Sequence, residues 1–197
     1  WCNALTEYYN ANNGTLEDLT PAYNIIARSS PARSAAALES SGNDVTQVSG
    51  AKGFRMPLAL EWEYAARYLG TAGAAYAITN TGSLYTSLTP GYYWTPGSYA
   101  SGAAGTGAAD IGLVSWYSGN SGGAKHEVAT KAPNALGLYD MSGNVWDRCF
   151  DISTGDYTCN KGGSFYNDTS FLPIGETLGN GKDINTFIFG LRLAQSK

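Results

Sequence analysis

The chain has 197 residues, of which 43% are hydrophobic and 14% are charged. This apolar content is enough for one core, so we predict a single domain over residues 1–197. The formal net charge of −4 and the absence of basic clusters exclude a nucleic-acid partner, because phosphate binding needs grouped lysine and arginine. No apolar run approaches the roughly 20 residues that span a bilayer, so membrane attachment is expected only through an anchor outside this chain.

The first quarter of the sequence predicts one helix and two short strands. Apolar residues recur at helical spacing over residues 1–12, and an Asn-Asn-Gly turn follows them. The apolar group Tyr23–Ala27 predicts a strand, and Val45 and Val48 mark a second one. Because the helical pattern is already under way at Trp1, we expect further residues before it, such as a signal peptide or lipid anchor.

A second helix is predicted from Pro57 to Gly70. Proline suits the first turn of a helix, and glycine suits the residue that follows its last turn. Apolar residues occupy two faces of this segment, which predicts that the helix is buried on both. The two faces comprise Leu60, Tyr64 and Ala65, and Trp62, Ala66 and Leu69.

A long region of mostly irregular structure is predicted from Thr71 to Gly123, where Gly, Ser, Ala, Thr and Tyr dominate. It is broken by Tyr92-Tyr93-Trp94 and by Ile111–Tyr117. Within it, Gly119–Gly123 matches the G-x-S-x-G pattern of a hydrolase nucleophile turn. No helical segment follows the pattern, and His126 is too near in sequence to act as a separately placed base. We therefore interpret this motif as a glycine-rich turn.

The segment Asn134–Ser164 combines turn residues with core-sized apolar residues. It begins with a tight bend over 133–137, because proline restricts φ and glycine permits a positive φ. Short strands are predicted after it at Arg148–Ile152, Tyr157–Ser164 and Phe187–Ala194. We expect the loops between these strands to carry exposed aromatic and aliphatic side chains.

The three cysteines, Cys2, Cys149 and Cys159, allow at most one disulfide within the chain. Cys149 and Cys159 are ten positions apart across a predicted hairpin. They could form a disulfide only if their Cα atoms come within about 7 Å. The sequence leaves this bond open.

Several motifs in order along the chain resemble the formylglycine-generating-enzyme, or sulfatase-modifying-factor, family. The resemblance implies an α+β, C-type-lectin-like fold with two helices, short antiparallel strands and many loops. The motifs are Gly53-Phe54-Arg55-Met56-Pro57, Glu61-Trp62-Glu63-Tyr64-Ala65-Ala66-Arg67, Asn134 to Trp146, Gly162-Gly163-Ser164 and Gly190-Leu191-Arg192.

The resemblance also bears on catalysis, because enzymes of this family hold copper through cysteines between the Gly-Gly-Ser and Gly-Phe-Arg motifs. Here that segment, Phe165–Phe189, contains no cysteine or histidine, and copper(I) needs such soft ligands. Related iron-dependent sulfoxide synthases need several histidines, and this chain has one. The remaining candidates for acid–base chemistry are Asp147 with Asp151 and Asp156 with Asp168, which we interpret as solvated turn residues. We therefore expect no enzyme.

A structural calcium ion is a further implication of the resemblance. In the family, the acid of the Leu-Tyr-Asp motif, nearby carbonyls and the acid after tryptophan often hold calcium. The corresponding residues here are Asp140, Gly143, Val145 and Asp147. Asp147 is shorter than the usual glutamate, so the expectation is either no cofactor or a structural calcium ion.

The chain resembles one branch of the family more closely: the variable proteins of diversity-generating retroelements. In these proteins, template adenines are randomised on copying, and AAY codons never yield Trp, Met, Gln, Lys or Glu. Residues 147–189 form the candidate variable region, in which Lys161, Glu176 and Lys182 should be framework. The alternatives are an ordinary solvated loop region, a calcium-dependent lectin-like carbohydrate binder, or an inactive enzyme-like module.

This resemblance implies a monomeric ligand-binding protein at the cell surface, as a bacterial lipoprotein, whose ligand we expect to be a protein. Aromatic side chains would supply contact area and polar ones would discriminate between ligands. The candidate ligand-binding residues are Asp147, Arg148, Ile152, Asp156, Tyr157, Phe165, Tyr166, Asn167, Asp168, Phe171, Leu172, Phe187 and Phe189.

Overall fold

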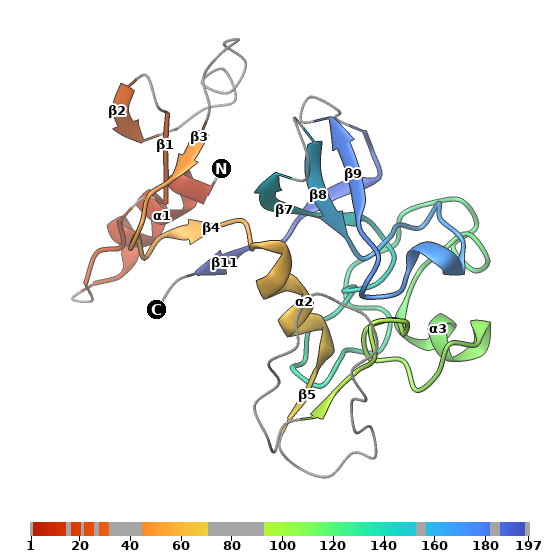
Figure 1. Cartoon of the computed structure of the whole chain (residues 1–197). Coiled ribbons are helices and arrows are strands. Elements are labelled where there is room, and N and C mark those ends of the chain that lie inside the picture. Colours follow the sequence, from red (N-terminus) through yellow and green to blue (C-terminus); the bar gives the residue numbers. More distant parts are fainter. Residues whose placement is uncertain are drawn as a thin grey trace. The chain divides into compact units, whose positions relative to one another are not determined.

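The computed structural model divides the chain into two compact units, which we describe separately (Figure 1). One unit comprises residues 1–56 and 192–197, and the other comprises residues 57–191. The structure describes residues 2–14, 17–20, 22–25, 28–31, 45–70, 93–152, 157–181 and 186–195. Several of these strand residues, including 151–152 and 157–158, are described by their backbone alone. The predicted single domain stays a prediction.

The smaller unit contains one helix and two small antiparallel sheets. Its elements are α1 (Cys2–Asn12), β1 (Tyr23–Ile25), β2 (Arg28–Pro31), β3 (Val45–Gln47), β4 (Phe54–Arg55) and β11 (Ala194–Gln195). The strand order is β2-β1-β3 in one sheet and β11-β4 in the other. Thr6 of α1 is fully buried, and its hydroxyl accepts a hydrogen bond from the Phe54 amide of β4 at 2.9 Å. The predicted helix and both predicted strands are therefore present.

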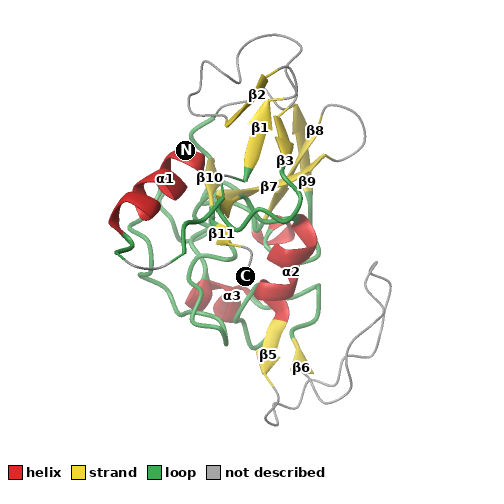
Figure 2. Cartoon of the chain, turned by 90° about the vertical axis from the view of Figure 1, so that its left-hand side faces the viewer, coloured by secondary structure: helices red, strands yellow, loops and turns green. Residues whose placement is uncertain are grey.

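The larger unit is built on a four-stranded sheet with the order β10-β7-β8-β9 (Figure 2). The strands are β7 (Trp146–Ile152), β8 (Tyr157–Lys161), β9 (Leu178–Gly181) and β10 (Phe189–Leu191). β7, β8 and β9 pair antiparallel as expected, but β10 pairs parallel with β7. The expectation of one strand over Phe187–Ala194 is wrong, because β10 and β11 are separate strands that belong to different units.

The first helix of the larger unit, α2 (Ala59–Arg67), buries only one of its two apolar faces. Trp62 and Ala66 are 1% exposed, whereas Leu60 and Tyr64 on the other face are exposed. A Glu61 side-chain oxygen accepts a hydrogen bond from the Leu58 amide at 2.9 Å, which satisfies a donor at the start of the helix. The helix also ends earlier than predicted, because Tyr68–Gly70 forms strand β5, which pairs with β6 (Tyr93–Trp94).

A third helix, α3 (Ala108–Val114), lies inside the segment that the sequence predicted as irregular. It buries Ile111 and Val114 in a cluster with Leu172 and two alanines. A second cluster joins α2 to the sheet through Trp62, Ala66, Met141, Cys149, Cys159 and Ile174. Within the described part of the chain, no helix is long and apolar enough to cross a membrane.

Candidate ligand-binding surface

The turn that opens the central segment is held by the side chain of Asn134. Its Oδ1 accepts hydrogen bonds from the amides of Leu136 and Leu138, at 3.0 and 3.1 Å. Its Nδ2 donates to the carbonyl of Ala65 in α2 at 2.9 Å. Gly137 has a φ of 74°, which glycine adopts without strain. The predicted bend is confirmed, and one asparagine fixes both its shape and its position on α2.

Asn144 connects three loops beside the sheet. It has a φ of 58°, a left-handed conformation that asparagine tolerates. Its side chain exchanges two hydrogen bonds with the backbone of His126, each at 3.1 Å. Its amide donates to the Trp116 carbonyl, and its carbonyl accepts from the Phe165 amide, both at 2.8 Å. Asn144 therefore holds in place the backbone from which the candidate surface projects.

Two glycines end β8 and turn the chain outward. Gly162 and Gly163 have φ values of 91° and 75°. A Cβ on Gly162 would lie 2.7 Å from the Met141 carbonyl oxygen, and one on Gly163 would lie 2.8 Å from that of Phe171. Only glycine fits both positions, which explains why the strand predicted to reach Ser164 ends at Lys161.

The segment Ser164–Phe171 follows these glycines, and we call it the strap. Hydrogen bonds within the strap and from the neighbouring loop hold its backbone in place. The Ser164 hydroxyl donates to Asn167 Oδ1 at 2.6 Å. The Ser118 amide donates to the Asn167 carbonyl at 2.9 Å, and the Ser121 hydroxyl donates to the Phe165 carbonyl at 2.8 Å. The strap therefore has a defined backbone without being part of a strand.

The G-x-S-x-G pattern helps to hold the strap in place, and its serine is not arranged as a nucleophile. Ser121 is 3% exposed, and its hydroxyl donates its hydrogen bond to the Phe165 carbonyl of the strap. His126 Nε2 lies 2.8 Å from the Ser121 carbonyl oxygen, and its ring stacks on Trp116 at a centroid distance of 3.7 Å. The interpretation of this motif as a structural turn agrees with these contacts.

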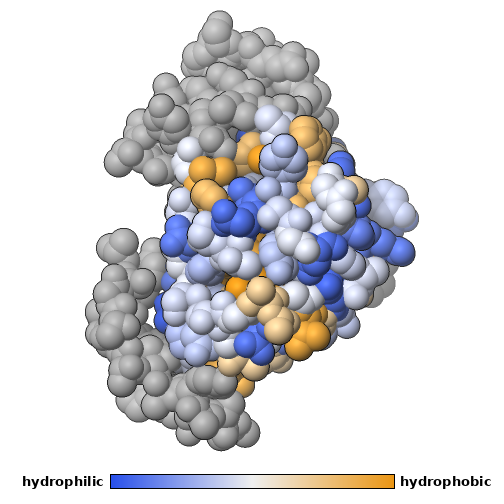
Figure 3. All heavy atoms as spheres, turned by 90° about the vertical axis from the view of Figure 1, so that its right-hand side faces the viewer, coloured by the Kyte–Doolittle hydropathy of each residue, from blue (hydrophilic) through white to orange (hydrophobic). Residues whose placement is uncertain are grey.

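Three aromatic side chains from the strap and the turn before β10 are exposed. The exposed fractions are 67% for Tyr166, 65% for Phe187 and 39% for Phe171. Figure 3 shows one face of the molecule, on which hydrophobic residues form small patches separated by hydrophilic ones. We use the name aromatic surface for the exposed or half-buried candidates, which are Arg148, Tyr166, Asn167, Asp168, Phe171, Phe187 and Phe189.

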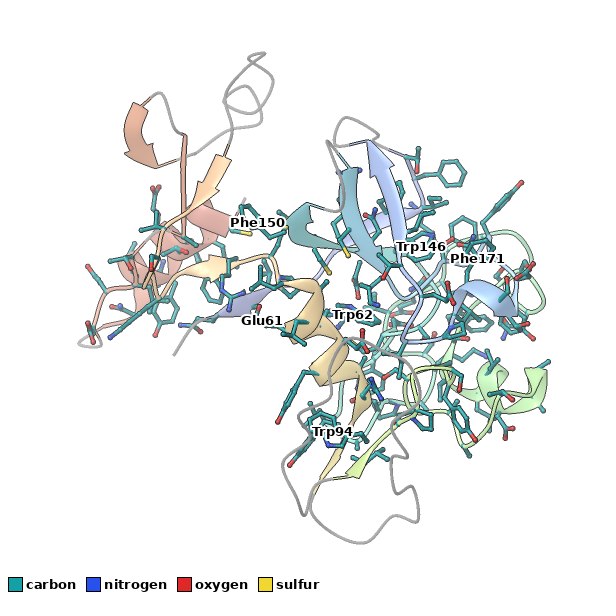
Figure 4. All side chains as sticks on the ribbon, in the orientation of Figure 1. Glu61, Trp62, Trp94, Trp146, Phe150 and Phe171 are labelled. Atoms are coloured by element: carbon teal, nitrogen blue, oxygen red, sulfur yellow. The ribbon has the colours of Figure 1, made fainter. Side chains whose placement is uncertain are left out.

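Buried rings support the exposed ones. The Phe165 ring lies 6.1 Å from Tyr166 and 6.0 Å from Phe187 between centroids. Trp146 lies edge-on to Phe171 at 6.3 Å (Figure 4). Trp146 and Phe165 are at most 2% exposed, so they give the aromatic surface a fixed base.

Two charged groups belong to the aromatic surface. Asp168 caps the short helix η2 (Thr169–Phe171), and hydrogen bonds from the Ser170 hydroxyl and amide lower the pKa of its carboxyl group. The Arg148 guanidinium lies over the Phe189 ring at 5.0 Å. Burial lowers the pKa of Arg148 below its ordinary value. The surface thus offers a carboxylate and a guanidinium beside its rings.

Three of the predicted binding residues are buried, so their assignment was wrong. Phe165 is 2% exposed and lies beneath the surface, and Leu172 is fully buried in the cluster with α3. Asp147 is 5% exposed, and its Oδ2 accepts a hydrogen bond from Trp62 Nε1 at 2.8 Å. Tyr166 and Phe171, which adjoin Phe165 and Leu172 in sequence, are exposed, and the sequence alone does not distinguish buried from exposed positions in this irregular segment.

The remaining predicted binding residues are Ile152, Asp156 and Tyr157. Ile152 and Tyr157 are at the ends of β7 and β8, where the backbone alone is described. Asp156 lies outside the described residues, as does the proposed pairing of Asp156 with Asp168. These three assignments stay predictions.

A buried ionic network lies on the core side of the sheet. Lys161 is 2% exposed, and its Nζ lies 3.4 Å from Glu63 Oε2 and 3.2 Å from Thr177 Oγ1. Glu63 also pairs with Arg67 at 3.0 Å. Sequence reasoning assigned Lys161 to the framework but did not find its partner, because Glu63 lies 98 positions away.

The two carboxylates among the predicted calcium ligands each accept a hydrogen bond within the protein. Asp140 Oδ2 accepts from the Ala129 amide at 2.8 Å, and Asp147 Oδ2 accepts from Trp62. The Gly143 amide donates to the Gly162 carbonyl, and a Cβ on Gly143 would lie 2.4 Å from the Trp116 carbonyl oxygen. Among the described residues, no group of three or more His, Cys, Asp or Glu side chains could hold a metal ion. Calcium binding through Asp140, Gly143, Val145 and Asp147 stays a prediction.

The fold and the ordered motifs together define an α+β protein of the C-type-lectin-like class. The chain belongs to the family of the sulfatase-modifying factor enzyme 1-like domain, whose model matches residues 7–197.

Three relatives show how far this similarity extends. A formylglycine-generating enzyme of Streptomyces coelicolor is 34% identical over 111 residues, which cover 56% of this chain and 30% of that protein. The structure of Treponema denticola variable protein 1 is 25% identical, with a TM-score of 0.66, and the match covers 98% of this chain and 66% of that one. The structure of CarF, at 20% identity and a TM-score of 0.53 over 98% of this chain and 62% of that one, shares the fold. The chain therefore spans less than two thirds of each relative.

Proposed function

We propose that this protein is a non-catalytic binding protein that displays a diversified surface, as a diversity-generating retroelement variable protein. The observation that carries the proposal is the division between buried and exposed residues within 147–189. Tyr166, Asp168, Phe171 and Phe187 are exposed, while the backbone beneath them is held by buried groups. A surface of this kind tolerates substitution, because the free energy of folding resides mainly in buried contacts.

Lys161 supports the same proposal. Its AAA or AAG codon cannot arise from a randomised AAY codon, so the proposal requires it to be framework. It is the most deeply buried charged side chain among the described residues. Two other residues cannot arise from AAY codons. Glu176 is exposed, and Lys182 lies outside the described residues. The framework assignment therefore has structural support at Lys161.

The proposed absence of catalysis rests on the composition of Phe165–Phe189, which has no cysteine or histidine. The thiols of Cys149 and Cys159 lie in the hydrophobic core, where they cannot present an open copper site to a substrate. The similarity to Treponema denticola variable protein 1 over 98% of this chain favours a binding protein over a formylglycine-generating enzyme.

We further propose a protein ligand, because the exposed rings beside a carboxylate and a guanidinium match the composition of protein-binding surfaces. The proposal includes a monomer at the cell surface, tethered as a lipoprotein by an anchor outside this chain. The tether and the location derive from the family resemblance.

A pair of display libraries tests the proposed function. One library randomises Arg148, Tyr166, Asp168, Phe171 and Phe187, and a matched library randomises five buried positions, namely Asp147, Lys161, Phe165, Leu172 and Ile174. We expect most members of the first library to resist protease and some to be enriched on an immobilised protein such as lysozyme. The matched library should be protease-sensitive. Equal sensitivity of both libraries would contradict the proposal.

We also propose that folding does not depend on calcium. A calcium ion at 100 times its dissociation constant would add about 2.7 kcal/mol, or roughly 5–10 °C in Tm for a chain of this size. We expect millimolar calcium and EDTA to give the same Tm. If calcium raises the Tm of the parent but not that of the Asp140→Asn variant, the family site is retained.

A further inference from the structure

Cys149 and Cys159 lie on the paired strands β7 and β8, each one position beyond the last regular pair. The strand register pairs Asp147 with Lys161 and Arg148 with Asn160. The next position on β7 is Cys149, and the next on β8 is Cys159. The register shifts between Arg148 and Ile152, so Cys149 adjoins the last regular pair.

Both thiols lie on the same face of the sheet. Cys149 is 3% exposed and Cys159 is 5% exposed, and both pack in the cluster with Trp62 and Met141. Opposite residues of antiparallel strands have Cα atoms about 4.5–5.5 Å apart. Disulfides join Cα atoms about 4.4–6.8 Å apart, a range that contains this spacing.

We propose that Cys149 and Cys159 form a disulfide when the chain folds under oxidising conditions. A disulfide oxidant such as oxidised glutathione takes two electrons from the two thiols. One S–S bond forms in the protein, the S–S bond of glutathione breaks, and two molecules of reduced glutathione leave with the two thiol protons. The third cysteine, Cys2, belongs to the other compact unit and stays a thiol.

The bond would constrain the part of the hairpin that carries Ile152 and Tyr157. A disulfide across paired strands restricts the unfolded chain and therefore stabilises the folded one. It also fixes the strand register, which otherwise depends on the side chains of both strands. A hairpin with a fixed register can accept different residues at its tip without slipping. This inference rests on the register and burial and does not require the proposed binding function.

Refolding in a glutathione buffer tests the inference. The purified chain is unfolded in urea with reductant, then refolded with either reduced glutathione or a mixture rich in oxidised glutathione. Thiols are counted with a maleimide reagent after denaturation. We expect three thiols from the reduced sample and one from the oxidised sample, with a mass lower by two hydrogens. A non-reducing digest should contain one peptide pair that joins Cys149 to Cys159, and the oxidised protein should have the higher Tm.

The Cys2→Ser variant is the matched control, since it should lose two thiols on oxidation and retain none. The Cys159→Ala variant should retain both remaining thiols. The inference is overturned if the oxidised parent still has three thiols, carries glutathione on Cys149 or Cys159, or contains a bond that includes Cys2. A bond between Cys149 and Cys159 that lowers the Tm would overturn the stabilising role.

Discussion

The Lys161→Met variant should lose about 3–5 kcal/mol of folding free energy, because it leaves the Glu63 carboxylate buried with one fewer positive partner. For a chain of this size, that loss corresponds to a fall in Tm of roughly 6–20 °C. Arg67 still pairs with Glu63 at 3.0 Å, which places the expected loss at the lower end. Urea unfolding followed by fluorescence measures the change.

Two further variants isolate the buried pair. Lys52→Met removes an ion pair with Glu17 whose side chains are 48% and 79% exposed, and it should change stability by less than about 0.5 kcal/mol. In the Lys161→Met background, Glu63→Gln should lower the free energy of unfolding much less than it does in the parent. In the parent it leaves the Lys161 ammonium buried without its carboxylate, and in the Lys161→Met background that ammonium is already absent. Full additivity of the two substitutions would show that Lys161 and Glu63 do not interact.

Phe165→Ala should destabilise the fold by about 3–5 kcal/mol, whereas Tyr166→Ala should change it by about 0.5 kcal/mol or less. The two residues are adjacent and both aromatic, but Phe165 is 2% exposed and Tyr166 is 67% exposed. The Phe165 ring also supports Tyr166 and Phe187, so its loss should disturb the aromatic surface. Comparing their thermal unfolding tests the assignment of strap residues to core and surface.

The combined variant with alanine at Tyr166, Phe171 and Phe187 extends this comparison. It should keep a Tm close to that of the parent, because these side chains are exposed. A large fall in its Tm would show that these rings belong to the core.

The family resemblance predicted the fold class, and turn chemistry predicted the central turn from sequence. Pro133 and Gly137 predicted the bend through their backbone preferences, and Gly137 has the expected positive φ. The hydrogen bonds of the Asn134 side chain were not predicted. Helix α3 was missed, because its Ala-Ala-Asp-Ile-Gly-Leu-Val sequence contains glycine and lies among other small residues. Its existence depends on packing of Ile111 and Val114 against Leu172, which is far away in sequence.

The candidate surface could be predicted only as a region. Phe165 and Tyr166 have similar side chains, and their opposite directions follow from the turn at Gly162–Gly163 and from hydrogen bonds to Ser118 and Ser121. Asp147 appeared to be an exposed polar residue, but its partner Trp62 lies 85 positions earlier. Such long-range contacts carry no local sequence signal, which is why the burial of Phe165 and Asp147 could not be predicted.

Sequencing the gene and its flanking DNA across many cells of the source population tests the central claim most directly. The account predicts a reverse-transcriptase gene beside a near-copy of the segment that encodes residues 147–192. Substitutions should match adenines of that copy and should fall at exposed positions such as Tyr166, Asp168 and Phe187, while Lys161, Phe165 and Leu172 stay constant. Absence of the near-copy, or equal variation at the buried positions, would contradict the claim that this fold displays a diversified surface.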